Sequence, residues 1–101
     1  MNKIILTGRL TNDPELTTTP NGISVTKFAL AVQRRYTNEA GERECDFINC
    51  VAWRTLADTV HKYCKKGVKI GIVGEVQTRN YEAQDGTKRY VFEVIANEIG
   101  F

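Results

Sequence analysis

The chain has 101 residues, of which 42% are hydrophobic and 26% charged, the balance of an ordinary soluble globular protein. This length predicts one domain over residues 1–101 and excludes a second. Fourteen Lys and Arg against twelve Asp and Glu give a net charge of +2, too small to indicate a polyanion partner by itself. No apolar run approaches the roughly 20 residues of a membrane span, and no signal-peptide pattern is visible, so we expect a cytoplasmic chain without a membrane partner.

Three cysteines and one histidine, His61, have no zinc-ligand spacing and predict reduced thiols and no metal site. Cys45 and Cys50 would lie on opposite faces of one strand, which argues against a redox pair. His61 is expected to be a solvated helical residue, and no phosphate-binding or nucleophile motif occurs. We therefore expect no enzyme activity, no catalytic residue and no cofactor.

The first β-patterned run follows the N-terminus, and Gly8 within it predicts a bulge or a close backbone approach. Turn residues follow at 13–14 and 20–22. Alternating apolar residues over 23–32 predict a second strand, with a bulge where the alternation slips after Val25.

A third β-patterned run covers 45–53, and both of its faces are largely apolar. One face carries Phe47, Val51 and Trp53, and the other carries Ile48, Cys50 and Ala52. This pattern predicts either burial on both sides or one face kept for a ligand or partner. For Phe47 and Trp53, core packing and ligand contact are equally good interpretations.

A short helix is predicted next. Leu56, Ala57, Val60 and Cys64 fall at helical spacing and indicate about three turns. Lys65 and Lys66 suit the last turn, where they would complement the helix dipole, and Gly67 suits the position just after it.

Two more β-patterned runs complete the chain. Val68 starts the fourth run, in which Gly74 permits sharp coiling, and Asp85-Gly86 predicts a hairpin. The fifth strand covers 90–99, with Phe92 expected in the core. Three strands, a helix and two strands predict an all-β, five-stranded OB-fold barrel with one short α-helix between strands three and four, a fold whose face and loops hold oligonucleotides.

Four aromatic residues lie outside the clear core stripes or at strand ends: Tyr36, Phe47, Trp53 and Tyr81. Bases stack on such rings without specific hydrogen bonds, so a site built from them tolerates many sequences. Tyr36 and Tyr81 each adjoin a polar loop and follow basic residues, which favours exposed platforms over core positions.

Basic residues recur at strand ends and hairpins, namely Arg9, Arg34, Arg35, Arg54, Arg79, Lys88 and Arg89. They could take phosphates, or they could simply form a solvated face. Their closeness to aromatics, as in Arg35-Tyr36 and Trp53-Arg54, favours a groove that follows a nucleic-acid backbone and stacks its bases.

Several segments together resemble the bacterial single-stranded DNA-binding protein family over essentially the whole chain. They are NKIILTGRL at 2–10, DPE at 13–15, PNG at 20–22, DFINCVAW at 46–53 and QTRNY at 77–81. The resemblance implies an OB-fold subunit that wraps single-stranded DNA around a homotetramer in replication, recombination and repair, at the nucleoid. The family's stacking positions carry over onto Tyr36, Phe47, Trp53 and Tyr81, and its basic positions onto Arg79 and Lys66.

Members of that family usually continue into a glycine- and proline-rich tail with an acidic tip, which recruits replication and repair proteins. This chain stops at Phe101, directly after the fifth predicted strand. We therefore expect either a tail-truncated chain or a short form of the protein, such as a phage or plasmid version, and its contacts with replication and repair proteins stay open.

Two other functions remain open. One is a tail-less primosomal replication-restart OB protein, a dimer that acts mainly through protein contacts. The other is an oligomerising structural domain whose aromatics are interface residues. Lys3 and Ile5 on the exposed edge of the first strand, and Ile48 opposite Phe47, are the predicted contacts between copies.

Overall fold

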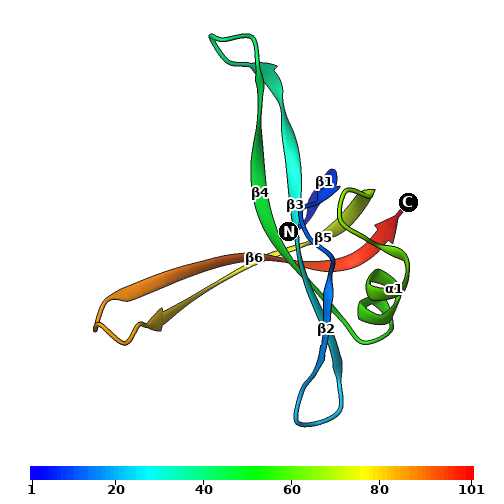
Figure 1. The fold of residues 1–101 in the computed structure, drawn as a ribbon. Helices are drawn as coiled ribbons and strands as arrows, with labels where there is room; N and C mark the ends of the chain where they lie inside the picture. Colours follow the sequence, from blue (N-terminus) through cyan, green and yellow to red (C-terminus); the bar gives the residue numbers. More distant parts are fainter.

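A computed structural model describes all residues, 1–101. The elements are β1 (Ile4–Leu10), β2 (Glu15–Thr18), β3 (Ser24–Thr37), β4 (Arg43–Trp53), α1 (Thr55–Tyr63), β5 (Lys69–Glu82) and β6 (Lys88–Gly100) (Figure 1). The strands are ordered β1-β5-β6-β4-β3-β2, and a second pairing of β1 with β3 closes the sheet. The predicted five-stranded OB barrel with one short helix is confirmed. α1 is neither long nor apolar enough to cross a membrane.

The short strand β2 is an addition to the predicted order. Its four residues are all exposed and pair antiparallel with the first part of β3, from Glu15↔Lys27 to Thr18↔Ser24. An exposed edge strand of this length has no alternation of apolar and polar residues, so the sequence pattern shows only the turns on either side of it.

The predicted bulge in the second strand is wrong in position. β3 pairs regularly with β4 from Val25 onward, and the register shifts only between Gln33 and Thr37. The slip after Val25 has another cause. Val25 is buried between β2 and Trp53, while the neighbouring Thr26 faces the core and its Oγ1 donates to the Ala57 carbonyl oxygen at 3.0 Å.

Gly8 lets the barrel close. A Cβ at this position would lie 2.6 Å from the carbonyl oxygen of Ala31, so no side chain fits where β1 crosses β3. The predicted close backbone approach is confirmed. Gly74 has a similar place in β5, beside the Ile95 carbonyl and next to a register shift in the β5–β6 pairing.

The helix ends earlier than the sequence predicts. α1 stops at Tyr63, and Cys64 is already extended with φ −105° and ψ 134°. Lys65 and Lys66 therefore lie beyond the last turn, and the prediction that they complement the helix dipole is wrong. Gly67 adopts φ 87° in a separate turn, where the Val68 amide donates to the Lys65 carbonyl at 3.0 Å.

The core fills the barrel between the strands and α1. Its twelve residues are Leu10, Phe28, Leu30, Cys50, Ala52, Ala57, Val60, Cys64, Ile70, Ile72, Val94 and Ala96. Two hairpins, β3–β4 and β5–β6, extend beyond this core as separate arms (Figure 1). Phe92, which we expected in the core, lies in the second arm and is 48% exposed.

Candidate nucleic-acid interface

The sequence of β4 leaves open whether both of its faces are buried, and the structure shows that the two faces differ. The inward residues Cys50 and Ala52 belong to the core. On the outward face Phe47 is 70% exposed and Trp53 is 42% exposed. Trp53 and Phe47 are therefore surface residues on one face of one strand, and one face of β4 remains available for a ligand.

Small residues on β3 leave the ring of Phe47 uncovered, whereas Trp53 lies opposite Val25. Ala31 pairs with Phe47, and Ala29 pairs with Asn49. A neighbour without a long side chain cannot cover a phenyl ring across the strand pair. The Phe47 ring is thus held on a strand while its faces stay open to solvent, and Trp53 is partly exposed.

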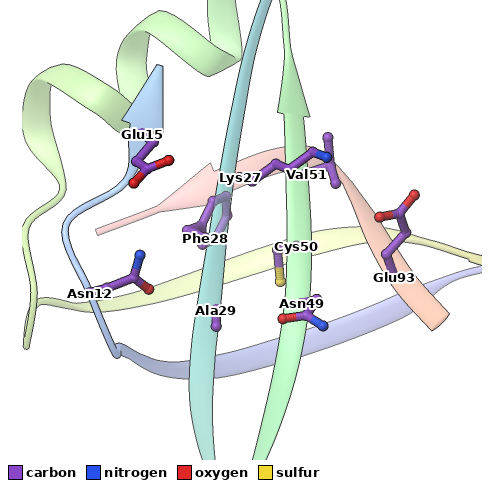
Figure 2. Close-up of a pocket in the computed structure, with 9 residues that line it drawn as sticks. All are labelled: Asn12, Glu15, Lys27, Phe28, Ala29, Asn49, Cys50, Val51 and Glu93. Atoms are coloured by element: carbon purple, nitrogen blue, oxygen red, sulfur yellow. The ribbon is translucent and has the colours of Figure 1, made fainter. Parts of the chain in front are cut away.

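Two hollows adjoin along this face. The first has a volume of about 380 Å³ and is lined by Asn12, Glu15, Lys27, Phe28, Ala29, Asn49, Cys50, Val51 and Glu93 (Figure 2). The second has a volume of about 350 Å³ and is lined by Thr17, Thr18, Thr19, Val25, Lys27, Val51, Trp53, Arg79 and Glu93. Lys27, Val51 and Glu93 line both, so the hollows form one depression, which we call the β4 groove.

The β5–β6 arm contributes a second row of side chains to the same face. Arg79 lines the groove with its Nε 3.8 Å from Oε1 of Glu93. Tyr81 pairs with Arg89 two residues further along the arm, so both share the face of Arg79. Tyr81 is 49% exposed. Trp53 and Arg79 thus line the same hollow, and Tyr81 and Arg89 lie farther along the face of Arg79; a role of these residues in base stacking and phosphate binding stays a prediction.

The tip of the β3–β4 arm carries Arg35 and Tyr36, which are both exposed. The register shift between Gln33 and Thr37 lies in this part of β3, so alternation does not fix the face to which Tyr36 belongs. Both residues lie along the same arm as Phe47, farther from the core.

Arg34 lies apart from the groove. Its guanidinium donates to Asp46 at 2.8 Å and 3.0 Å and to Glu44 at 3.0 Å, on the face of the arm opposite Phe47. The hydrogen bond from Arg34 lowers the pKa of Asp46, and the hydrogen bond to Asp46 raises the pKa of Arg34. Arg34 is therefore paired with two carboxylates on the surface of the arm, and its side chain is 55% exposed.

Arg9 lies on the outward face at another hollow. Its Nη1 donates to the Gly67 carbonyl at 2.9 Å, and it lines a depression of about 470 Å³ with Gln33, Cys45 and Lys69. Ala31, the partner of Phe47 on β3, lines the same depression. Arg9 is therefore placed beyond Phe47, away from Trp53.

Three predicted basic residues are exposed outside the groove. Arg54 joins β4 to α1 with φ 62°, and it is the one residue other than glycine with a positive φ. Lys66 lies in the loop after α1, where its amide donates to Oδ1 of Asp13 at 2.8 Å. Lys88 pairs with Glu82 on the face of the arm opposite Arg89.

Sequence reasoning missed two cations on the outward face, Lys27 and Lys69. Lys27 lines both hollows of the groove, and Lys69 lies with Arg9. The available signal for Lys27 was a charged residue at an outward position between buried Thr26 and Phe28. The apolar residues around Lys27 dominate the sequence pattern and obscure this single charge.

The predicted contacts between copies fall into two groups. β1 pairs with β5 along its length but with β3 only at Arg9 and Leu10, so the other edge of β1 is free over its first residues. Lys3 and Ile5 are exposed there, Ile5 by 70%. Ile48 is instead half-buried, opposite Leu30 and packed against the core.

The thiols are not grouped for chemistry. Cys45 is exposed while Cys50 and Cys64 are buried, and the regular pairing of β3 with β4 from Val25 to Gln33 confirms opposite faces for Cys45 and Cys50. Burial raises the pKa of Cys50 to about 12 and also raises that of Cys64. No group of three or more His, Cys, Asp and Glu side chains is placed to hold a metal ion.

Comparison with known proteins gives a consistent result. The model of the Single-strand binding protein family matches residues 1–101. A "Single-stranded DNA-binding protein" of Bacillus cereus is 56% identical over 101 residues, and "Single-stranded DNA-binding protein A" of Bacillus subtilis is 54% identical; each alignment covers 100% of this chain and 59% of the relative. "Single-stranded DNA-binding protein 2" of Listeria monocytogenes is 54% identical over 100% of this chain and 63% of its own length. The chain spans about three fifths of the length of these relatives.

Proposed function

The chain belongs to the single-strand binding protein family, and we propose that it binds single-stranded DNA along the outward face of β4 with little preference for sequence. The observation that carries this proposal is the exposure of Phe47 and Trp53 on one face, beside the cations of the β5–β6 arm. Rings held open on rigid strands are suited to bases, because every base has a flat face to stack. The proposal is one of binding without turnover.

Base stacking and phosphate contacts would involve different parts of the DNA strand. Phe47, Trp53 and Tyr81 would take bases, with Tyr36 extending the row along the β3–β4 arm. Each stacked base contributes roughly 1–3 kcal/mol. Phosphates would lie at the rim, where the exposed guanidinium groups of Arg79 and Arg89 share the face of Tyr81.

The other predicted cations would act on the flanks of this path. Arg9 with Lys69, and Arg35 at the arm tip, lie toward the Phe47 end. Arg54, Lys66 and Lys88 would meet the strand only outside the groove. We assign no phosphate contact to Arg34, because two carboxylates hold it.

We further propose that the chain assembles into a homotetramer and protects single strands in the cytoplasm, at the nucleoid, during replication, recombination and repair. The free edge of β1, with Lys3 and Ile5, is suited to pairing with the same edge of a second copy. Ile48 would contribute through the part of its side chain that the core leaves exposed. The mass in solution tests this assembly, and a dimer would instead favour the replication-restart interpretation.

Fluorescence of Trp53 gives the direct test of binding, because it is the only tryptophan. Titration with oligo(dT) should quench it strongly, since the ring lies in the groove and would stack with a base. A duplex of equal length should leave the signal almost unchanged. Absence of both quenching and a change in anisotropy with oligo(dT) would contradict the proposal.

A further inference from the structure

The middle of the β4 groove differs from its ends. Along the outward face of β4 the order is Phe47, Asn49, Val51 and Trp53, so the two rings are separated by roughly 20 Å at the usual rise of a strand. β4 carries no aromatic residue between them, and Phe28, which lines the first hollow from β3, is a buried core residue. A nucleotide crossing this interval has no ring to stack on and meets polar side chains.

Glu93 is the polar group set deepest in this interval. Its side chain is 19% exposed, against 59% for Arg79. The nearest cation is the Arg79 Nε at 3.8 Å, beyond hydrogen-bond distance, and no protein group donates a hydrogen bond to the carboxylate. An ionised carboxylate has about four acceptor positions. Glu93 therefore presents unfilled acceptors to whatever enters the groove.

The groups around this interval include both a cation and carboxylates. Lys27 extends from β3 across β4, with Glu15 on one side and Glu93 on the other (Figure 2). Lys27 can only donate and a carboxylate can only accept. A phosphate would be repelled by the carboxylates, whereas the edge of a base offers both donors and acceptors. The charges thus favour bases directed toward the floor and phosphates at the rim.

We propose that Glu93 makes the middle of the groove a subsite for bases with an exocyclic amino group, so that cytosine is favoured there over thymine; this inference rests on the proposed function. The cytosine N4 amino group can donate a hydrogen bond to a carboxylate. Thymine has a carbonyl oxygen at the same position, which would place two hydrogen-bond acceptors against each other at Glu93. The two pyrimidines are similar in size, so the hollow itself does not distinguish them. Glu93 becomes a specificity-determining residue within an otherwise tolerant site.

The test compares the dissociation constants of oligo(dC) and oligo(dT) of equal length, at one salt concentration, for the unmodified protein and Glu93→Gln. The glutamine keeps the size of the side chain, loses the charge that strengthens the hydrogen bond from cytosine, and can donate to a thymine carbonyl. Affinity for oligo(dC) relative to oligo(dT) should fall about fivefold. Comparing ratios removes the intrinsic difference between the two strands, which is the same for both proteins.

Glu82→Gln is the matched control, because Glu82 lies on the other face of the same arm and its replacement changes the net charge equally. It should leave the ratio unchanged. Glu93→Ala should shift the ratio in the same direction as Glu93→Gln, and thermal unfolding checks that each variant is folded.

If Glu93→Gln alters both affinities equally, Glu93 acts only by orienting Arg79 and the base subsite is wrong, while DNA binding stands. If the unmodified protein binds neither oligonucleotide, the proposed function falls and the subsite falls with it.

Discussion

The two faces of β4 carry similar apolar side chains in opposite environments. Inward, Cys50 and Ala52 are almost completely excluded from water, and Leu30 beside them on β3 is 0% exposed. Outward, Phe47 and Trp53 keep much of their surface in solvent. The hydrophobic residues on the first face belong to the core, whereas Phe47 and Trp53 on the second are the residues that we propose bind bases. The difference predicts that stability and DNA affinity respond separately to substitution.

The largest effect should come from the inward face. Leu30→Ala removes a fully buried side chain, and we expect the free energy of unfolding to fall by about 3 kcal/mol. Urea denaturation measures this change. At a temperature where the variant is still fully folded, its affinity for oligo(dT) should match that of the unmodified protein; a large loss of affinity would show that the two faces are not independent.

The outward face should show the reverse. Trp53→Ala or Phe47→Ala should each weaken oligo(dT) binding by about 30-fold, since one stacked base is lost. The free energy of unfolding should change little. Fluorescence anisotropy of a labelled oligonucleotide measures the affinity.

Tyr63→Ala is a control for these two variants. Tyr63 is also exposed, but its ring packs edge-on against Phe101 at a centroid distance of 6.3 Å, and it lines neither hollow of the groove. Its replacement should leave affinity unchanged. An equal loss in all three variants would mean that exposed aromatics contribute without regard to position.

Arg79 and Arg34 allow a further test of the difference between the groove and the rest of the surface. The slope of log K against log salt should become less steep by about 0.7 in Arg79→Ala, because one phosphate contact to a single strand is lost. Arg34→Ala should leave the slope unchanged, because Glu44 and Asp46 already neutralise Arg34. Titrations at four or five salt concentrations measure both slopes, and a change for Arg34 alone would reverse our assignment.

The smallest effect concerns the thiols of β4. Cys45 should react with a thiol reagent in the folded protein, while Cys50 and Cys64 should not. Burial raises the pKa of Cys50 from its ordinary 9.0 to about 12, so the folded state holds this proton more tightly than the unfolded state. The resulting stability is complete below pH 9 and is lost as the pH rises from there toward 12.

By pH 10 the loss should be on the order of 1 kcal/mol. Urea denaturation at neutral and alkaline pH measures it, and Cys50→Ala should remove this part of the pH dependence. Rapid labelling of all three thiols would instead show that the inward face opens easily.

Much of the fold can be predicted because alternation and turn residues carry it. The order of strands around α1, the close approach at Gly8 and the hairpin at Asp85-Gly86 are all local signals. β2 lacks such a signal because it is short and fully exposed. The end of α1 differs from the prediction because Cys64 continues the helical spacing of apolar residues. Cys64 is buried as that spacing suggests, but its backbone is extended.

The site was harder to predict, for a reason seen in Phe92. Phe92 has the inward parity of Val94, yet its part of β6 extends past the barrel, where no opposite wall exists to bury it. The alternation of residues along a strand predicts the face on which a side chain lies, but it does not predict whether another part of the protein covers that face. Arg34 shows the same limit for charges, because its two carboxylate partners come from a strand whose register the sequence does not give.

The alternation along β4 also determines where evolution can change the length of the chain. One residue inserted between Asn49 and Cys50 would turn Phe47 inward and Ile48 outward, because a shift by one exchanges the faces of a strand. The turns at 38–42 and 83–87 lie at the tips of the arms, where an added residue changes no facing. Related proteins should therefore vary in length at these two turns, and insertions and deletions should be absent from β4.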